Sequence, residues 1–298
     1  MDWIEKMNMA IAYIEEHITD KLNTEELAKI ANCSVYHFQR MFACMTGIPL
    51  SEYIRRRRMS LAVADLKSKD VKIIDVALKY DYSSPTAFNR AFQSVHGIAP
   101  SLVKHDGVFV KSYPPLNFQM VVKGVESFDF RIEKKEAFRV VGASITMYGD
   151  MEHMTEPMDQ LWEVLEANGT MDKIKGLTDG QPTGLLEVMA PDGNTEEWKY
   201  LLGVASEKEI DGKLEAYTVD AYTWAIFKYK GKIMDDIEEG EGLGYRVIKE
   251  WLPTSGYEYD NGPDINVHIE SDVEGSESEF WIPVKKSKQS EEKNHDRF

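Results

Sequence analysis

Two segments of nearly the same wording, about fifty residues apart, constrain the fold of this 298-residue chain more than any other feature. Residues 37–48 read HFQRMFACMTGI, and residues 87–98 read AFNRAFQSVHGI. Ser34 and Ser84 stand where a helix containing each segment would begin, and a serine there can accept a hydrogen bond from a free backbone amide. Gly47 can close the first helix, because glycine tolerates the left-handed backbone that ends many helices. The two segments therefore predict two similar, capped helices.

A shorter helix is expected before each of these helices, over residues 24–32 and 71–80, so the chain contains one helix-turn-helix unit twice. Pro49 begins a longer helix that runs to about Lys67 and joins the two units. Its length of roughly 27 Å compares with a spacing of about 34 Å between successive major-groove faces of DNA. We therefore predict an all-α N-terminal domain with two helix-turn-helix units joined by a long helix, which fit neighbouring grooves of one duplex without a dimer.

The second helix of each unit carries the candidate DNA contacts. Phe38 and Phe42 are four residues apart and face the core, as do their counterparts in the second unit, so the residues between them point outward. Arginine pairs with guanine, and glutamine or asparagine with adenine, whereas serine, lysine and amides at helix N-termini hold phosphates. The outward positions are Tyr36, His37, Gln39, Arg40, Thr86, Asn89 and Arg90, and the candidate phosphate contacts are Ser34, Ser84 and Lys104.

Four consecutive arginines, Arg55–Arg58, lie on the joining helix. Four consecutive residues cover more than one helical turn, so the four side chains cannot all face DNA. Two interpretations stay open at this point. Either the run is a solvated helix face, or one or two of these arginines contact phosphate or pair with nearby acidic residues.

The net charge of −16 is distributed unevenly. Residues 1–110 carry 14 basic and 13 acidic residues, a net charge of +1, and residues 111–298 carry the remaining 21 and 38, a net charge of −17. Residues 29–104 alone carry 12 basic and 5 acidic residues, a net charge of +7. A cationic block joined to an acidic one indicates that the two parts have separate functions.

No stretch of about 18 or more apolar residues is present, so we expect no membrane span and no membrane partner. The first twenty residues have acids where a signal peptide needs bases, which favours a cytoplasmic protein. Cys33 and Cys44 are too few for a disulfide framework and lie in no metal-ligand cluster. We therefore expect neither a metal nor a cofactor.

The pattern changes after residues 1–107. A proline-containing stretch over residues 108–125 is expected to be a linker, residues 126–286 to be a second domain, and residues 287–298 to be a polar tail. In the second domain, extended, helical, extended and extended segments follow one another, and the order repeats after about 80 residues, where GLLEVMAPD lies over DINVHIESD. This repeat predicts an α+β domain with an antiparallel sheet and a pseudo-two-fold repeat.

Aromatic and acidic residues on the expected strands are the candidate ligand contacts. Glu187 interrupts an apolar strand, and His268 shares one strand face with Glu270 because side chains alternate along a strand. A carboxylate among aromatic side chains suits a lipophilic cation, although a solvent-facing position on a half-exposed sheet stays open as the alternative. The candidate ligand-binding residues are Tyr148, Glu187, Trp224, Tyr229, His268, Glu270 and Trp281.

Residues 24–104 resemble the DNA-binding domain of the AraC/XylS transcription regulators. The segments that carry the resemblance are LAKIANCSVYHFQRMFACMTGIPLSEYIRRRRMSLAVADL and IIDVALKYDYSSPTAFNRAFQSVHGIAPS. The resemblance implies two helix-turn-helix units on a central helix that read two turns of double-stranded promoter DNA. Its base-reading positions map onto Tyr36, Gln39, Arg40, Pro85, Thr86, Asn89 and Arg90, and Pro85 departs from the polar residue often found there.

Residues 126–286 resemble the GyrI-like effector-binding domain, a small-molecule receptor. The segments FDFRIEKKEAFRVVGASI and YEYDNGPDINVHIE carry the resemblance, together with SEFWIPVKK. Relatives often place a glutamate after the Gly-Pro turn, where this chain has Asn266, and Glu270 or Glu187 can substitute for it. Binding of a hydrophobic ligand is therefore expected, with neutral and cationic ligands both left open.

Together the resemblances imply a cytoplasmic transcription regulator that binds promoter DNA, contacts RNA polymerase and senses a small hydrophobic or cationic effector. Family analogy favours an activator over a repressor. Two alternatives stay open: a GyrI-like hydrolase of a reactive small molecule that uses Trp224 and Glu187, and an acidic protein-interaction module. We expect no enzyme, because the sequence shows no nucleophile–base pair and no phosphate loop.

Overall fold

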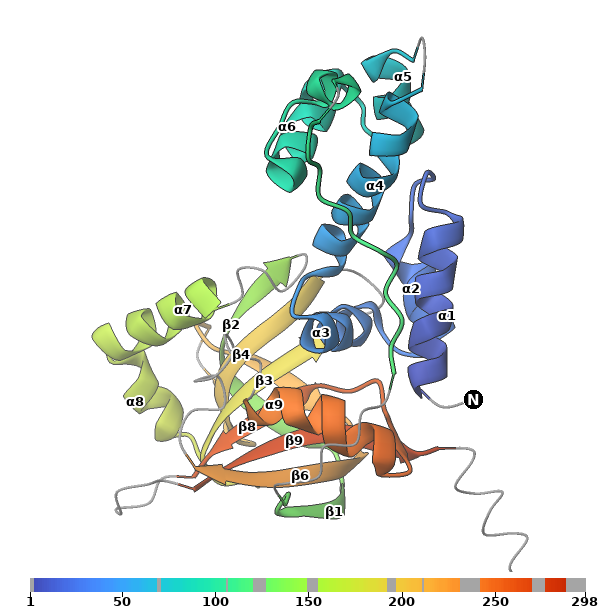
Figure 1. Cartoon of the computed structure of the whole chain (residues 1–298). Helices are drawn as coiled ribbons and strands as arrows, with labels where there is room; N and C mark the ends of the chain where they lie inside the picture. Colours follow the sequence, from blue (N-terminus) through green and yellow to red (C-terminus); the bar gives the residue numbers. More distant parts are fainter. Residues whose placement is uncertain are drawn as a thin grey trace, which may run out of the picture.

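The protein is described here by a computed structural model that covers residues 3–68, 71–105, 107–119, 127–148, 155–191, 197–210, 212–230, 242–269 and 277–287. A helical domain leads into a C-terminal domain built on one large sheet (Figure 1). The helical domain consists of α1 Trp3–Glu16, α2 Thr24–Ala31, α3 Val35–Thr46, α4 Leu50–Leu66, α5 Ile73–Lys79, α6 Pro85–His96 and a 3-10 turn over Pro100–Lys104.

The two helix-turn-helix units predicted from the repeat are confirmed as α2–α3 and α5–α6. Ser34 precedes α3 and accepts a hydrogen bond from the His37 amide, and Ser84 does the same for α6. Gly47 and Gly97 follow the two helices with φ angles of 72° and 76°, a conformation that costs glycine little. The repeat in sequence is therefore a repeat of the local structure.

Helix α4 joins the two units over 17 residues, which corresponds to about 26 Å. The predicted phenylalanine faces are confirmed: Phe88 and Phe92 are fully buried in one cluster with residues of α4, and Phe38 and Phe42 are fully buried in another. The first of these clusters belongs to the helical domain alone. The second also contains residues of the C-terminal domain, so the first helix-turn-helix unit shares its core with that domain.

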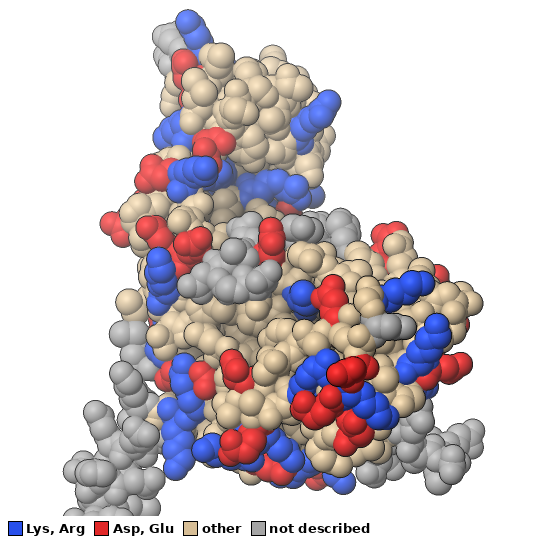
Figure 2. Space-filling model, turned by 180° about the vertical axis from the view of Figure 1, so that it is seen from behind, with Lys and Arg blue, Asp and Glu red and all other residues tan. Residues whose placement is uncertain are grey.

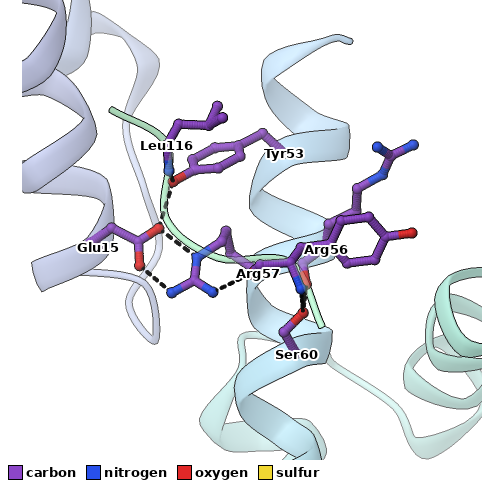
Figure 3. A network of polar contacts seen from close by, with 7 residues as sticks. Glu15, Tyr53, Arg56, Arg57, Ser60 and Leu116 are labelled. Carbon is purple, nitrogen blue, oxygen red and sulfur yellow. Dashed lines mark hydrogen bonds and ion pairs between the residues drawn. The ribbon is translucent and has the colours of Figure 1, made fainter. Parts of the chain in front are cut away.

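The chain segment after α6 returns along α4 and is fastened there by Arg57 (Figure 3). The Arg57 guanidinium donates to both carboxylate oxygens of Glu15, at 2.8 and 2.6 Å, and to the carbonyl oxygen of Tyr113. The Tyr113 amide donates to Ser60 Oγ at 3.0 Å, and the Tyr53 hydroxyl donates to Glu15 at 2.7 Å. This arginine therefore ties the connecting segment to both α1 and α4.

The other arginines of the run also pair with acids. Arg55 and Arg56 both contact Glu52 on their own helix, and Arg58 contacts Asp81. The pairing with nearby acids is therefore observed, and Arg57 and Arg58 are buried rather than on a solvated face. Figure 2 shows Lys and Arg side chains gathered beside acidic ones below the upper lobe of the molecule.

The C-terminal domain contains one antiparallel sheet, as predicted. The strands are β1 Phe130–Lys135, β2 Phe138–Tyr148, β3 Leu185–Pro191, β4 Glu197–Ala205, β5 Glu215–Val219, β6 Tyr222–Lys230, β7 Tyr257–Tyr259, β8 Asp264–His268 and β9 Glu277–Lys286. They lie in the order β1-β6-β9-β8-β3-β4-β2-β5, and β7 pairs with β9. The short strand β7 was not predicted.

The strand order confirms the pseudo-two-fold repeat. Replacing β1, β2, β3 and β4 by β5, β6, β8 and β9 turns the order into its own reverse, with the axis between β3 and β8. Strands β1 and β5 are exchanged, since β1 pairs with β6 of the second half and β5 pairs with β2 of the first. The two halves are therefore joined both by the pairing of β3 with β8 and by the exchange of β1 and β5.

Helices cover the two ends of one sheet face. Helix α7 (Thr155–Ala167) and α8 (Thr170–Lys175) lie over the first half, and α8 was not predicted. Helix α9 (Leu243–Arg246) continues into a π-helical turn over Val247–Trp251 and a 3-10 turn over Leu252–Thr254, and these lie over the second half. Helix α3 of the helical domain packs against both halves of the same face (Figure 1).

Candidate functional site

The pairing of β3 with β8 places Glu187 beside Asn266 at the centre of the sheet. The Tyr200 hydroxyl donates to Glu187 Oε2 at 3.0 Å, and His268 Nε2 contacts Glu187 Oε1. Trp162 of α7 donates its indole N–H to the Tyr200 oxygen at 2.9 Å. The buried carboxylate is thus held in a fixed orientation by polar groups from β4, β8 and α7.

Asn266 is the second polar group at this centre. Its side chain is 2% exposed, and Oδ1 has no hydrogen-bond partner among the described residues. A buried carbonyl oxygen without a donor costs about 1–3 kcal/mol, so it is a position where a ligand donor is favoured. Phe280 and Tyr229 lie on the same face, and burial raises the pKa of Tyr229 to about 12, which keeps its ring neutral.

Three of the predicted ligand residues come together here: Glu187, His268 and Tyr229. They share one sheet face because His268 pairs across the strands with Leu185, two positions before Glu187, and Tyr229 pairs with Ser278, which in turn pairs with His268. Two other predicted residues lie outside what the structure describes. Glu270 falls in the undescribed residues, and Tyr148 ends β2 with a side chain that is not described.

Trp224 and Trp281 do not lie with the other predicted ligand residues. Both are buried on the opposite face of the sheet, where their ring centroids lie 5.6 Å apart. The Trp281 indole donates to Glu279 at 2.9 Å on that face. The expected hydrolase arrangement needed Trp224 beside Glu187, and the alternation of side chains along β6 and β3 separates them.

Sequence reasoning missed four polar or aromatic residues of this face, namely Trp162, Trp198, Tyr200 and Asp264. Trp198 and Tyr200 lie on β4 and Trp162 lies on α7, and nothing in the sequence pattern distinguishes them from the other aromatic residues of these elements. The signal for Asp264 was its spacing, since it stands two positions before Asn266 and therefore on the same face.

The candidate DNA contacts on α6 are accessible as predicted. Thr86, Asn89 and Arg90 are exposed, and so is Pro85 at the first turn of the helix. Ser84 is half-buried, and its hydroxyl caps the helix. The side-chain oxygen Oδ1 of Asn89 accepts a hydrogen bond from the Gln93 side chain, which leaves the Asn89 NH₂ group as a donor on the surface. This helix therefore presents a polar edge of the kind that enters a major groove.

The corresponding prediction for α3 was wrong. Tyr36, His37 and Gln39 were expected to be exposed, but they are 3%, 1% and 8% exposed, and Ser34 is buried as well. The Arg40 side chain is 12% exposed and forms an ion pair with Asp264 of β8. The reason is that the outward face of α3 lies against the C-terminal domain. The sequence pattern of the helical domain alone gives no sign of this contact.

Two aromatic contacts accompany this ion pair. The Tyr36 ring lies 5.3 Å from the Trp198 ring, and the His37 ring lies 4.6 Å from the Tyr259 ring. His37 Nδ1 is 2.8 Å from the Ser34 hydroxyl. Burial and the nearby Arg40 guanidinium lower the pKa of His37 to about 3, so the imidazole is neutral in this arrangement.

Helices long and apolar enough to cross a membrane are absent from the described residues. Within the same residues, no cluster of three or more His, Cys, Asp or Glu side chains has a metal-binding arrangement. Cys33 and Cys44 are both free thiols, and burial raises the pKa of Cys33 to about 12. The thiolate form of Cys33 is therefore disfavoured at neutral pH.

Comparison with known proteins gives a match for each domain. Residues 27–105 match a helix-turn-helix domain family, and residues 128–285 match the GyrI-like small molecule binding domain family. The HTH-type transcriptional activator AarP of Providencia stuartii is 37% identical over 94 residues, which are 32% of this chain and 70% of AarP. Regulatory protein SoxS of Escherichia coli is 38% identical over 95 residues, which are 32% of this chain and 89% of SoxS.

Among solved structures, a putative bacterial transcription regulation protein from Staphylococcus aureus MU50 is similar to about half of this chain. It is 15% identical with a TM-score of 0.45, and the similarity covers 53% of this chain and 99% of that chain.

Proposed function

The chain belongs to the AraC/XylS family of transcription regulators and carries a GyrI-like small-molecule-binding domain, and from this premise we propose how its two domains divide the work. The helical domain reads promoter DNA with α3 and α6. The C-terminal domain binds a hydrophobic cation on the sheet face around Glu187 and Asn266.

The observation that carries the effector site is the buried pair at the pseudo-two-fold axis. Glu187 supplies a fixed negative charge, and Asn266 Oδ1 supplies an acceptor without a donor among the described residues. Phe280 and Tyr229 supply aromatic surface on the same face. An anion among aromatic rings favours a cation with an apolar body through Coulomb attraction and cation–π contact.

The proposed DNA contacts on α6 are Thr86, Asn89 and Arg90, which are exposed and lie on one edge of the helix. Those on α3 are Tyr36, Gln39 and Arg40, which require the helix to leave the C-terminal domain. Arginine and asparagine supply the bidentate hydrogen bonds that distinguish guanine and adenine in the major groove.

We place the regulator in the cytoplasm with the promoter, and we propose RNA polymerase as the partner through which it activates transcription. An acidic interaction module is less well supported. On the described face in Figure 2, acidic side chains of the C-terminal domain lie interspersed with basic ones rather than in one patch.

Substitution Glu187→Gln tests the effector site. It keeps an acceptor oxygen for the Tyr200 hydroxyl, removes the charge and places an NH₂ group beside His268 Nε2. We expect the Kd for tetraphenylphosphonium to rise at least tenfold, about 1.4 kcal/mol, and the Kd for neutral triphenylphosphine oxide to change less than about twofold. Isothermal titration calorimetry measures both.

Glu279→Gln is the matched control, because Glu279 is a buried carboxylate that pairs with Arg131 on the other face of the sheet. It should bind tetraphenylphosphonium like the unaltered protein. Equal loss for the charged and the neutral ligand in Glu187→Gln would contradict charge recognition, and no binding of either ligand to the unaltered protein would contradict the effector site itself.

A further inference from the structure

The C-terminal domain holds the Arg40 side chain in the way that proteins recognise an organic cation. The guanidinium pairs with Asp264, a carboxylate with no exposed surface, which also accepts a hydrogen bond from the Tyr259 hydroxyl at 2.6 Å. It lies over the Phe280 ring at 5.7 Å from the centroid. A buried carboxylate and an aromatic face together satisfy both the charge and the plane of a guanidinium.

This contact lies directly beside the proposed effector site. Asp264 stands two positions before Asn266 on β8 and so lies on the same face, about 7 Å away along the strand. Met189, which pairs with Asp264 in the sheet and lies 4.0 Å from the Arg40 guanidinium, stands two positions after Glu187. A ligand with aromatic substituents on Glu187 and Asn266 therefore meets the space that α3 fills.

The docked surface of α3 is the edge proposed to read bases. Arg40 is engaged by Asp264, Tyr36 packs on Trp198, and His37 packs on Tyr259. The second recognition helix has no such cover, since Thr86 and Arg90 are exposed. In this arrangement one reader is available to DNA and the other is not.

We propose that the C-terminal domain binds the first recognition helix as an internal ligand, with Arg40 in the place of a cation, and that the effector releases the helix by competing for the same sheet face. The release step rests on the proposed function. Effector and two-groove DNA binding both require the undocked helix, so each strengthens the other by the same factor. When the effector binds, the protein can place two recognition helices in the major groove instead of one.

Substitution Asp264→Asn tests the docking without any effector. The asparagine keeps the shape and removes the charge that compensates Arg40, so the docked form is disfavoured while undocked Arg40 is solvated. Gly244→Leu is a second, independent change: a Cβ at Gly244 lies 3.9 Å from Arg40 Nη2, so the further atoms of a leucine compete with the docked guanidinium for the space that it fills.

Each protein is used at full length to select duplexes from a random DNA pool, and Kd values are measured by fluorescence anisotropy at one salt concentration. The unaltered protein should select a single half-site. Both variants should select two half-sites about one helical turn apart, and should bind that bipartite duplex at least tenfold more tightly than the unaltered protein does. Glu279→Gln, whose carboxylate lies on the opposite face, should behave like the unaltered protein.

Selection of the bipartite duplex by the unaltered protein, with a Kd within twofold of both variants, would overturn the inference. Hydrogen exchange of residues 35–46 gives a readout independent of DNA, because undocking should speed exchange in α3 of the variants and not in Glu279→Gln. Failure of the effector site leaves a different trace: tetraphenylphosphonium then does not raise the Tm of the unaltered protein, while the two variants still bind the bipartite duplex more tightly.

Discussion

Substitution Arg57→Met separates a structural role of the arginine run from a DNA-binding role. The Arg57 side chain is 8% exposed, and it joins Glu15 of α1 to the connecting segment at Tyr113 (Figure 3). Methionine keeps much of the apolar stem and removes every donor. The change therefore leaves the Glu15 carboxylate and the Tyr113 carbonyl without their arginine partner.

The expected loss follows from these contacts. Removing one partner of a buried ion pair costs about 3–5 kcal/mol. Glu15 keeps 20% of its side-chain surface exposed and still accepts from Tyr53, so water compensates part of the loss. We expect the free energy of unfolding to fall by about 3 kcal/mol at pH 7, a large share of the 5–15 kcal/mol that is typical of natural proteins.

The pH dependence has a defined sign. Burial raises the pKa of Glu15, but hydrogen bonds from Arg57 and Tyr53 outweigh it and hold the pKa below its ordinary value. A carboxylate with a lowered pKa stabilises the folded state above its ordinary pKa of about 4.5 and loses this contribution as the pH falls. The difference between the unaltered protein and Arg57→Met should therefore shrink between pH 7 and pH 3.

Urea denaturation followed by circular dichroism measures these differences, and Arg55→Met is the matched control. The Arg55 side chain is 41% exposed and pairs with Glu52 on its own helix, so its loss should cost no more than about 0.5 kcal/mol. The reasoning is refuted if Arg57→Met unfolds within 0.5 kcal/mol of the unaltered protein while binding all DNA sequences more weakly with a smaller salt slope, since that result describes a phosphate contact.

Two further predictions concern the recognition helices. His37 is neutral with a pKa of about 3 when α3 is docked, whereas an exposed histidine has a pKa near 6.5, so between these values the docked state binds fewer protons and acid weakens it, by about 2 kcal/mol at pH 5. Urea denaturation at pH 7 and pH 5 should show this loss in the unaltered protein and a smaller one in His37→Asn, and equal losses would contradict the assignment. Arg90→Ala should cost about 1–3 kcal/mol of binding to the selected duplex and change the free energy of unfolding by less than about 0.5 kcal/mol, because Arg90 is exposed. Anisotropy on matched and mutated half-sites checks whether the loss is confined to one base position, and a uniform loss on all sequences would make Arg90 a phosphate contact.

The helical domain could be predicted closely because its signals are local. Capping by Ser34 and Ser84 and closure by Gly47 depend on residues within one helical turn of each other. The strand pattern was also sufficient for the antiparallel sheet and its pseudo-two-fold repeat. The short strand β7 and the short helix α8 escaped, since elements of three and six residues leave too little periodicity to detect.

The candidate ligand site was predicted only in part. The alternation of side chains shows which residues of one strand share a face of the sheet, but it does not fix the register between that strand and its neighbours. Glu187 and His268 lie on one face, whereas Trp224 and Trp281, which composition groups with them, lie on the other. A count of positions along β6 cannot show which face is which until its partner β9 is known. Aromatic content alone therefore overestimates the number of residues at such a site.

The burial of α3 could not be read from the repeat, yet the repeat explains why α3 docks and α6 does not. Where α3 has Tyr36 and His37, α6 has Thr86 and Ala87, so α3 presents two rings to the C-terminal domain, whereas α6 has only two methyl groups and a hydroxyl at these positions. Burying a large side chain contributes about 1.5–3 kcal/mol, so two rings favour docking where the smaller pair cannot. Both helices have an arginine at the corresponding position, Arg40 in α3 and Arg90 in α6. The two units therefore share the arginine that reads DNA, but only α3 has the rings that dock on the C-terminal domain. An effector that displaces α3 alone changes which DNA sequences are bound as well as how tightly they are bound.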